Sequence, residues 1–141
     1  MENNGKSIKL RSVKKNDCLF LYNLLKERDS KANISHKKMP SFEQHEIFVD
    51  SKPYSKWYVI VESEEEVGSI YLTKNNEIGI FLKKNIQGKK IGEKALKLLM
   101  EKNSNSRYLA NVNPKNEKSI RFFKNNGFKL IQQTYELEKK I

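Results

Sequence analysis

Six residues, Gln87 to Gly92, combine glycines with a lysine pair in a way that suits the binding of a phosphate group. They follow the strand-like run Glu77 to Leu82 and lead into a helical pattern that begins near Gly88. The first amide groups of a helix have no partner within the helix, and the helix dipole favours an anion there. Lys89 and Lys90 add positive charge. The segment therefore predicts a pyrophosphate site, although a plain turn with solvated lysines would use the same residues.

This segment is neither of two common nucleotide-binding loops. No Gly-Lys-Ser or Gly-Lys-Thr closes it, so it is not a P-loop. The strands expected before it form an antiparallel meander, whereas the dinucleotide fingerprint needs a βαβ unit.

A second patterned segment runs from Asn116 to Phe128. It predicts a helix over Glu117–Asn125 with Ile120 on its buried side. Gly127 follows at the position just past a helix end, where glycine readily adopts the left-handed conformation that stops the helix.

The elements that must position these two segments alternate between strand and helix patterns. Period-two alternation and β-branched content predict six strands, over Ile8–Val13, Trp57–Glu62, Val67–Thr73, Glu77–Leu82, Arg107–Val112 and Phe128–Leu137. Helical spacing and capping signals predict four helices, one from Asn16-Asp17 to about Arg28, one opened by the capping box Ser41-Phe42-Glu43-Gln44, one over about Gly88–Lys102 and one over Glu117–Asn125. The order β-α-α-β-β-β-α-β-α-β predicts an α/β protein with one mixed sheet, a single domain over residues 1–141.

Positive charge is concentrated in the second half of the chain. The formal net charge is +11. Residues 1–70 hold 12 basic and 11 acidic side chains, whereas residues 71–141 hold 16 and 6. An AT-rich coding sequence explains 24 lysines against 4 arginines, but it does not explain why acidic residues become scarce after Glu77. A localised positive field predicts an anionic partner, which leaves nucleic acid, a membrane surface or a phosphorylated small molecule open.

Composition excludes several classes of protein. The 141 residues include 37% hydrophobic ones, enough for a core, but no run near the ~20 apolar residues of a membrane span. The first residues contain no apolar signal region, so we expect a cytoplasmic protein. Cys18 is the single cysteine, which excludes an internal disulfide and a cysteine-based metal cluster. The histidines His36 and His45, nine residues apart, do not make a metal site.

Together, the two segments resemble the motifs of the GNAT superfamily of acyl-CoA-dependent N-acetyltransferases. The pyrophosphate loop of that family reads Gln/Arg-x-x-Gly-x-Gly/Ala; here Gln87 and Gly92 match, and Lys90 stands in place of the first glycine. Lys90 would then have to take a helical backbone conformation, which the first turn of a helix permits. The later signature, Asn-x-x-Ser/Ala-x-x-Phe/Leu-Tyr-x-x-x-Gly-Phe, matches Asn116 to Phe128 except that Phe123 replaces tyrosine.

The resemblance implies a GNAT-like fold, a mixed and mostly antiparallel sheet whose central strands splay apart, flanked by helices. It also implies acetyl-CoA as the acyl donor, with pantetheine between the fourth and fifth strands. CoA carries about four negative charges on its phosphates, which suits the positive field. The cofactor-binding residues that it implies are Ile80, Phe81, Leu82, Gln87, Gly88, Lys89, Lys90, Ile91, Gly92, Asn116, Ser119, Phe122 and Phe123.

The catalytic groups are less defined, because the proton donor of the family falls on Phe123, which has no proton to give. Either Tyr135 or Tyr108 substitutes, or the thiolate leaves unassisted, since a free thiol has a pKa of about 8.5. Glu77, at the head of the fourth strand, is our candidate base, with a solvated strand-end carboxylate as the equal alternative. His36 in the first long loop is a weaker candidate, and we expect His45 in the core.

The implied activity is acetyl transfer by direct attack in a ternary complex, with a small primary amine as acceptor, such as an amino sugar, free or nucleotide-linked. A polyamine is disfavoured because acidic residues on the acceptor side are limited to Glu43, Glu46 and Asp50. The alternatives are acetylation of a protein amine and a non-catalytic acyl-CoA-binding domain, which Phe123 would suit. A nucleic-acid module has only the charge in its favour. We expect no nucleic-acid, membrane or metal partner, and a monomer or a homodimer.

Overall fold

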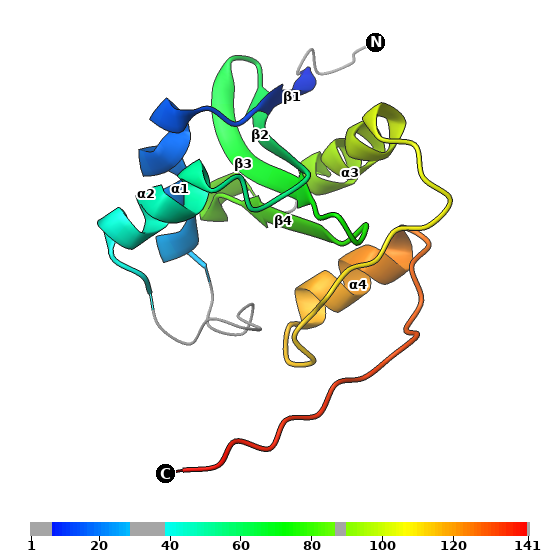
Figure 1. The fold of residues 1–141 in the computed structure, drawn as a ribbon. Coiled ribbons are helices and arrows are strands. Elements are labelled where there is room, and N and C mark those ends of the chain that lie inside the picture. The colour runs from blue at the N-terminus through cyan, green and yellow to red at the C-terminus, as the bar shows by residue number, and fades with distance from the viewer. Residues whose placement is uncertain (1–6, 29–38, 87–89, 141) are drawn as a thin grey trace.

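The computed structural model describes residues 7–28, 39–86 and 90–140. Its elements follow the predicted order through β4 and both later helices (Figure 1). They are β1 (Ile8–Ser12), the short helix η1 (Lys15–Asp17), α1 (Cys18–Lys26), α2 (Phe42–Asp50), β2 (Lys56–Glu62), β3 (Glu65–Leu72), β4 (Ile78–Leu82), the short helix η3 (Lys84–Ile86), α3 (Ile91–Lys102) and α4 (Glu117–Asn125).

The four strands form one antiparallel sheet in the order β1-β2-β3-β4. The turn between β2 and β3 contains Ser63 and Glu64 at φ values of 47° and 74°, the positive values that a tight hairpin turn requires. Short turns thus join β2, β3 and β4 into an antiparallel meander, as the sequence predicts.

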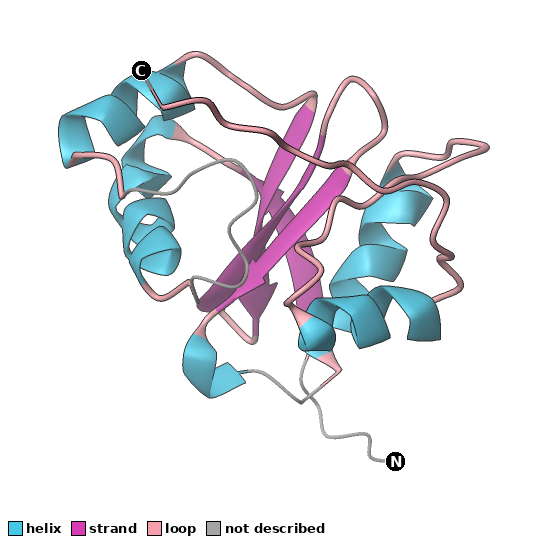
Figure 2. Cartoon of the chain, turned by 90° about the horizontal axis from the view of Figure 1, so that it is seen from below, coloured by secondary structure: helices cyan, strands magenta, loops and turns pink. Residues whose placement is uncertain are grey.

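Helices cover both faces of this sheet (Figure 2). On one face, α3 packs its buried Ala95, Leu96 and Leu99 against Ile60 and Ile70 of the central strands. On the other face, α1 and α2 meet through Cys18, Leu21 and Val49, with Trp57 of β2 packed against them. The pleat of a strand sends alternate side chains to opposite faces, so each face has its own core.

The predicted strand over Arg107–Val112 is wrong, because only Leu109 pairs with β4. A single parallel bridge joins it to Glu77. The Leu109 amide donates to the Asn76 carbonyl at 2.8 Å, and the Ile78 amide donates to the Leu109 carbonyl at 2.7 Å. Beyond this bridge, no strand pairing joins β4 to residues 110–113. Strand β4 is therefore open on this side beyond Ile78, which corresponds to the splayed strands that the resemblance implies.

The predicted strand over Phe128–Leu137 is also wrong. No strand is assigned there, and every residue from Lys129 to Lys140 is exposed. A strand exists only where a neighbour takes its backbone hydrogen bonds. The segment follows the predicted stop at Gly127, whose φ is +93°. There the amides of Gly127 and Phe128 donate to the carbonyls of Lys124 and Phe123 at 3.1 and 2.9 Å, which is a Schellman motif.

In the described part of the chain, no helix is long and apolar enough to cross a membrane.

Candidate functional site

A cleft of about 680 Å³ opens between helices α1 and α2 and the sheet face that they cover. The strands contribute its floor through Trp57, Ser69, Tyr71 and Phe81. The far wall comes from residues 111–113 and from α4. The cleft therefore ends where β4 loses its neighbour, against the second of the two segments that the sequence singled out.

The floor of the cleft depends on one glycine in β4. A Cβ atom on Gly79 would lie 2.1 Å from Cζ of Tyr71, which sits opposite it on β3. The phenol ring of Tyr71 therefore lies across the backbone of β4, a position that any other side chain would block. Gly79 thus lets an aromatic ring form part of the cleft floor.

Two more aromatic rings, those of Tyr54 and Phe48, join the rings of Tyr71 and Trp57 in an aromatic platform. Tyr54 stacks on Tyr71 with ring centres 3.8 Å apart and an angle of 3° between the planes. Trp57 meets Tyr54 edge to face at 4.8 Å, and Phe48 of α2 lies 6.0 Å from Trp57. Burial raises the pKa of both tyrosines, so these phenols stay neutral at physiological pH. The cleft therefore has an aromatic lining of stacked and nearly perpendicular rings that also carries hydroxyl groups.

Glu77 is the one carboxylate among the described residues that line the cleft. Its Oε1 accepts a hydrogen bond from Thr73 Oγ1 at 3.1 Å, and its Oε2 accepts one from Asn111 Nδ2 at 2.9 Å. The carboxylate is thus held between the end of β3 and the far wall. Two hydrogen bonds to separate segments make Glu77 an oriented group rather than a solvated strand end.

Arg28 is the one cationic side chain among the described residues that line the cleft. Its guanidinium lies 4.4 Å from the centre of the Phe81 ring, a cation–π contact. Burial lowers the pKa of Arg28, although a guanidinium stays protonated in proteins. Arg28 and Glu77 give the cleft one positive and one negative group.

His45 of α2 is buried, as predicted, but it also lines the cleft. Its ring packs against Tyr22 and Phe48, with ring centres 5.4 and 6.4 Å away. Among the described residues, its Nε2 has no hydrogen-bond partner. Burial lowers the pKa of His45, so the imidazole is neutral at physiological pH.

The splayed edge of β4 exposes backbone groups beside the cleft. The Thr73 amide donates a hydrogen bond to the Glu77 carbonyl, and the Lys83 amide donates one to the Val67 carbonyl. The backbone groups of the odd-numbered residues of β4 therefore point toward β3. The alternation of an antiparallel pair then directs the amides and carbonyls of Ile80 and Leu82 to the open side. Among the described residues, neither has a backbone partner on that side. An extended ligand can therefore form hydrogen bonds to Ile80 and Leu82 as a neighbouring strand would. The backbone groups of Phe81 point toward β3 instead, so they are not available to such a ligand.

The loop before α3 lies partly outside the described residues, which exclude Gln87, Gly88 and Lys89. Lys90, the next residue, has φ 62° and ψ 12°, so it adopts a left-handed conformation as the N-cap of α3. The expectation of a helical conformation for Lys90 is therefore wrong. At this position the family carries glycine, which takes the left-handed region without strain.

The two sequence motifs meet where α3 and α4 touch. A Cβ atom on Gly92 would lie 3.1 Å from the Phe122 ring, closer than side chains normally approach. Gly92 therefore lets α4 pack against the first turn of α3. Ile91 beside it is 2% exposed and belongs to the core, so only its backbone can serve a ligand.

The N-terminus of α4 faces the cleft. Asn116 is its N-cap, and the Asn116 Oδ1 accepts the amide of Ser119 at 3.2 Å. Asn116, Ser119 and the buried Phe123 all line the cleft. The motif from Asn116 to Phe128 thus closes one end of the cleft.

The two tyrosines suggested as proton donors lie elsewhere. Tyr135 is 88% exposed on the C-terminal segment, where its hydroxyl bonds Gln133 Oε1 at 3.1 Å. Tyr108 donates its hydroxyl to the Asn103 carbonyl at 2.6 Å and accepts the Asn105 amide at 2.9 Å, so it closes a loop. Neither lines the cleft of its own chain. The tyrosines that line the cleft together with Glu77 are instead Tyr71 and Tyr54.

Sequence reasoning did not find Tyr71, Tyr54, Arg28 or Asn111. They come from four separate segments, and no short motif links them. One signal was present, because a glycine inside a strand often marks a close approach of another group, and Gly79 is such a residue.

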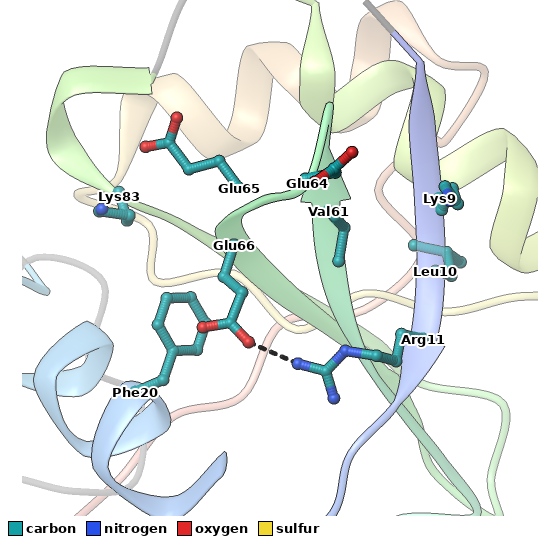
Figure 3. Close-up of a pocket in the computed structure, with 9 residues that line it drawn as sticks. All are labelled: Lys9, Leu10, Arg11, Phe20, Val61, Glu64, Glu65, Glu66 and Lys83. Atoms are coloured by element: carbon teal, nitrogen blue, oxygen red, sulfur yellow. Dashed lines mark hydrogen bonds and ion pairs between the residues drawn. The ribbon is translucent and has the colours of Figure 1, made fainter.

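A second hollow, of about 600 Å³, lies near the turn between β2 and β3. Figure 3 shows Arg11 of β1 reaching Glu66 in this hollow, and the two charged groups lie 2.5 Å apart. Arg11 also pairs with the buried Asp17 at 2.9 Å. Although burial raises the pKa of Asp17, hydrogen bonds from Arg11 and from the Lys14 backbone outweigh it and hold that pKa below its usual value. These charges tie β1, β3 and η1 together, which is a structural role.

No group of three or more metal-ligating side chains occurs in the part of the chain that the structure describes.

Comparisons with known proteins identify one matching family and several similar structures. The sequence profile of the acetyltransferase (GNAT) family matches residues 19–128. No curated protein matches the chain. A domain from Methanocaldococcus jannaschii is similar in structure, with 25% identity, a TM-score of 0.79, and coverage of 93% of this chain and 94% of that chain.

Two similar structures contain the cofactor. The ribosomal L7/L12 α-N-protein acetyltransferase in complex with CoA has 20% identity and a TM-score of 0.71, covering 89% of this chain and 82% of that chain. The protein yncA from Salmonella typhimurium with acetyl-CoA has 18% identity and a TM-score of 0.67, covering 86% of this chain and 79% of that chain.

Proposed function

Because the chain belongs to the acetyltransferase (GNAT) family, we propose that it moves the acetyl group of acetyl-CoA to the primary amine of a small molecule with a flat, apolar ring face. An amino sugar, free or nucleotide-linked, is the first candidate. The observation that carries this proposal is a single oriented carboxylate, Glu77, at the edge of an aromatic platform beside the open edge of β4.

The aromatic platform supports a ring-shaped acceptor. Sugar rings present C–H groups on one face, and those groups pack against flat apolar side chains such as Tyr54 and Tyr71. The remaining hydroxyl groups of a sugar need polar partners, which Ser69, Thr73 and Asn111 offer around the platform.

The charges of the cleft argue against a polyamine. A chain with several ammonium groups needs several carboxylates, and the described lining residues include Glu77 alone. Arg28 would repel such a ligand. The same arginine suits an acceptor that carries a phosphate or carboxylate, which favours a nucleotide-linked sugar.

The open edge of β4 suits the donor. The backbone groups of Ile80 and Leu82 would bind the pantetheine amides, and phosphates would lie near Lys90 and the start of α3. An amide from this edge would also stabilise the negative oxygen that develops on the thioester carbonyl.

The reaction then has two bond changes. The neutral amine attacks the thioester carbon, a C–N bond forms, and the carbonyl oxygen becomes an oxyanion. The C–S bond breaks as the oxyanion collapses, and the sulfur leaves with the electron pair as a thiolate. Glu77 takes the ammonium proton, directly or through a water molecule. No phenol is required as acid, because a thiol with a pKa of about 8.5 is a competent leaving group.

The test is a panel assay that follows free CoA thiol. The protein is mixed with acetyl-CoA and one acceptor: an amino sugar, a nucleotide-linked amino sugar, a peptide with a free N-terminus, or spermidine. We expect the highest kcat/KM with an amino sugar. Turnover confined to the peptide would replace the small acceptor with a protein, and no turnover on any amine would favour a non-catalytic binding domain.

A variant pair tests the role of Glu77. We expect Glu77→Gln to lower kcat about 100-fold, as the loss of a general base does, with acetyl-CoA binding unchanged. Glu65→Gln removes an exposed carboxylate from β3, away from the cleft, and should leave kcat unaltered. Equal rates in both variants would exclude Glu77 as the base.

A further inference from the structure

The hydroxyl group of Tyr71 lies over β4, one strand away from the backbone of its own residue. Tyr71 on β3 is paired in register with Gly79 on β4. A Cβ atom on Gly79 would overlap both Cζ and Oη of Tyr71, so the phenol extends across the sheet. Both residues line the cleft. The hydroxyl is therefore held over the strand whose far side is open.

Under the proposed function, on which this inference rests, the thioester of the donor would lie at the same place. The phosphates would lie near Lys90, and the pantetheine would run back along the open edge past Leu82 and Ile80. The next open-side residue is Ile78, and its amide already donates to the Leu109 carbonyl at 2.7 Å. A ligand paired with this edge therefore ends beside Gly79, next to the Tyr71 hydroxyl.

Tyr54 leaves the proton of this hydroxyl available. The rings of Tyr54 and Tyr71 are stacked with centres 3.8 Å apart, and their hydroxyl groups share a hydrogen bond. Burial raises the pKa of both phenols, and the shared bond raises the pKa of Tyr54 further but lowers that of Tyr71. These are the effects expected on a donor and on an acceptor, so Tyr54 donates and Tyr71 accepts. A hydroxyl that accepts a bond still has its own proton to donate.

We propose that the Tyr71 hydroxyl donates a hydrogen bond to the sulfur of CoA during acetyl transfer and stabilises the departing thiolate. When the C–S bond breaks, its electron pair stays on the sulfur, and Tyr71 keeps its proton. The thiolate takes a proton from water after it leaves, and Glu77 returns the amine proton to water. A donor aimed at a developing negative charge acts here as it does in an oxyanion hole.

The acidities of the two groups favour a hydrogen bond over transfer of the phenol proton. Burial holds the pKa of Tyr71 above the ordinary value of about 10, whereas a thiol has a pKa of about 8.5. The proton is therefore more stable on the phenol than on the sulfur. At the far wall, α4 presents Phe123, which is buried and has no group to donate. Tyr71 thus supplies from β3 the polar contact that α4 lacks.

The titratable side chains around this hydroxyl keep a constant charge between pH 7 and pH 9. Those that line the cleft among the described residues are Arg28, His45, Tyr54, Tyr71 and Glu77. The guanidinium stays protonated and the carboxylate stays ionised in this range. The imidazole stays neutral because burial lowers its pKa, and the phenols stay neutral because burial raises theirs. Within this set, a change over the range reports on the thiol of the ligand.

The test measures by calorimetry, at pH 7 and at pH 9, the binding of CoA and of desulfo-CoA, in which hydrogen replaces the thiol group. A donor that stabilises the thiolate lowers the pKa of the bound thiol, so CoA binds more tightly as pH rises, whereas desulfo-CoA gains nothing. We expect the ratio of the Kd of desulfo-CoA to that of CoA to rise on the order of tenfold in the wild type. No acceptor amine is needed.

Two matched variants assign this effect to one hydroxyl group. Tyr71→Phe keeps the ring and removes only the oxygen, so the ratio should be the same at both pH values. Tyr58→Phe makes the same change on β2 within the core beneath α3, and it should keep the rise of the wild type. Binding of desulfo-CoA by Tyr71→Phe shows that this variant is folded. A tenfold rise in Tyr71→Phe as well would overturn the proposal.

Steady-state kinetics with the best acceptor of the panel give a second measurement. Tyr71→Phe should lower kcat on the order of tenfold and leave KM for the acceptor unchanged, because the ring remains. Failure of this proposal is distinct from failure of the proposed function. A wild type that binds neither CoA nor desulfo-CoA would refute both, whereas one that binds both ligands with a constant ratio would refute the role of Tyr71 alone.

Discussion

Glycine at position 79 shows how a single residue shapes this site. Removing the side chain from one strand position lets Tyr71 of the neighbouring strand lie across β4, and Tyr54 then stacks on Tyr71. Glu77, two residues earlier, reaches the same cleft because the pleat places it on the same face. The candidate base and the glycine that makes room for the platform therefore lie two residues apart, whereas Tyr71 and Tyr54 come from other segments.

At this scale we predict that Gly79→Ala displaces the Tyr71 ring. The added Cβ would lie 2.1 Å from the ring, so the ring must move or the strands must shift. Such overpacking costs about 1–3 kcal/mol of folding free energy, and we expect KM for the acceptor to rise. Thermal unfolding and steady-state kinetics measure both effects.

A double-mutant cycle provides the control for Gly79→Ala. In a Tyr71→Ala background the clash is gone, so the second change should cost little further stability. If Gly79→Ala costs the same free energy in both backgrounds, the ring contact is not its cause.

His45 predicts how stability depends on pH. Burial lowers the pKa of His45 in the folded protein, whereas the unfolded chain has the ordinary value of about 6.5. As pH falls below about 6.5, the unfolded state takes up a proton that the folded state does not, so the free energy of unfolding decreases. In His45→Gln, this part of the decrease between pH 7 and pH 5 should disappear. Denaturant unfolding across this range measures it, and identical slopes in both proteins would contradict the assignment.

At the scale of the element, the start of α3 combines a strained residue with a close helix contact. Lys90 occupies a left-handed conformation, and Gly92 in the first turn of α3 allows Phe122 of α4 to approach. The family pattern places glycine at the first of these positions and glycine or alanine at the second, and this chain keeps only the second. The first position costs backbone strain, whereas a side chain at the second would push on the Phe122 ring.

We therefore predict that Lys90→Gly stabilises the protein. A side chain in the left-handed region costs about 1–2 kcal/mol, and the extra freedom of glycine in the unfolded state offsets part of the gain. The expected net increase is up to about 1 kcal/mol in the free energy of unfolding, measured by urea denaturation.

Lys94→Gly is the matched control, because it makes the same change at an exposed position within α3. Glycine in a helix interior costs about 1 kcal/mol, so this variant should be less stable than the wild type. Effects of the same sign in the two variants would show that the conformation of Lys90 is not strained.

At the scale of the whole molecule, charge and sheet geometry coincide. Of the 28 basic residues, 13 lie between Lys83 and Lys129, where only Glu93, Glu101 and Glu117 oppose them. Helices α3 and α4 carry Lys94, Lys97 and Lys124 as exposed residues. Under the proposed function, this positive charge belongs to the two helices that follow the proposed phosphate site.

This field predicts that acetyl-CoA binding weakens as salt increases. The screening length falls from about 10 Å at 0.1 M to about 3 Å at 1 M, so lysines that do not touch the phosphates lose their effect. We expect Kd to rise on the order of tenfold over this range, measured by calorimetry. S-acetylpantetheine lacks the nucleotide phosphates and is the control, since its Kd should change little. Equal salt dependence for both ligands would mean that the field serves another partner.

Features that depend on neighbouring residues were accessible from the sequence. The capping box is one, because Ser41 and Gln44 exchange hydrogen bonds at 2.9 and 3.1 Å over a span of three residues. The stop at Gly127 is another, since its bonds stay within one helical turn. The meander of β2, β3 and β4 belongs to the same class, because short turns join its strands. The family motifs likewise lie within two short segments of the chain.

Features that depend on distant residues were decided only by the tertiary structure. Asn111 reaches Glu77 across 34 positions, and Tyr71 lies over Gly79 because of the register between two strands. The alternation in residues 107–112 and 128–137 predicted two strands that the structure does not form beyond the single bridge at Leu109, because pairing requires a neighbour that the pattern cannot specify. The left-handed backbone of Lys90 at the N-cap of α3 is likewise visible only in the structure, because it is a conformation that a non-glycine residue disfavours.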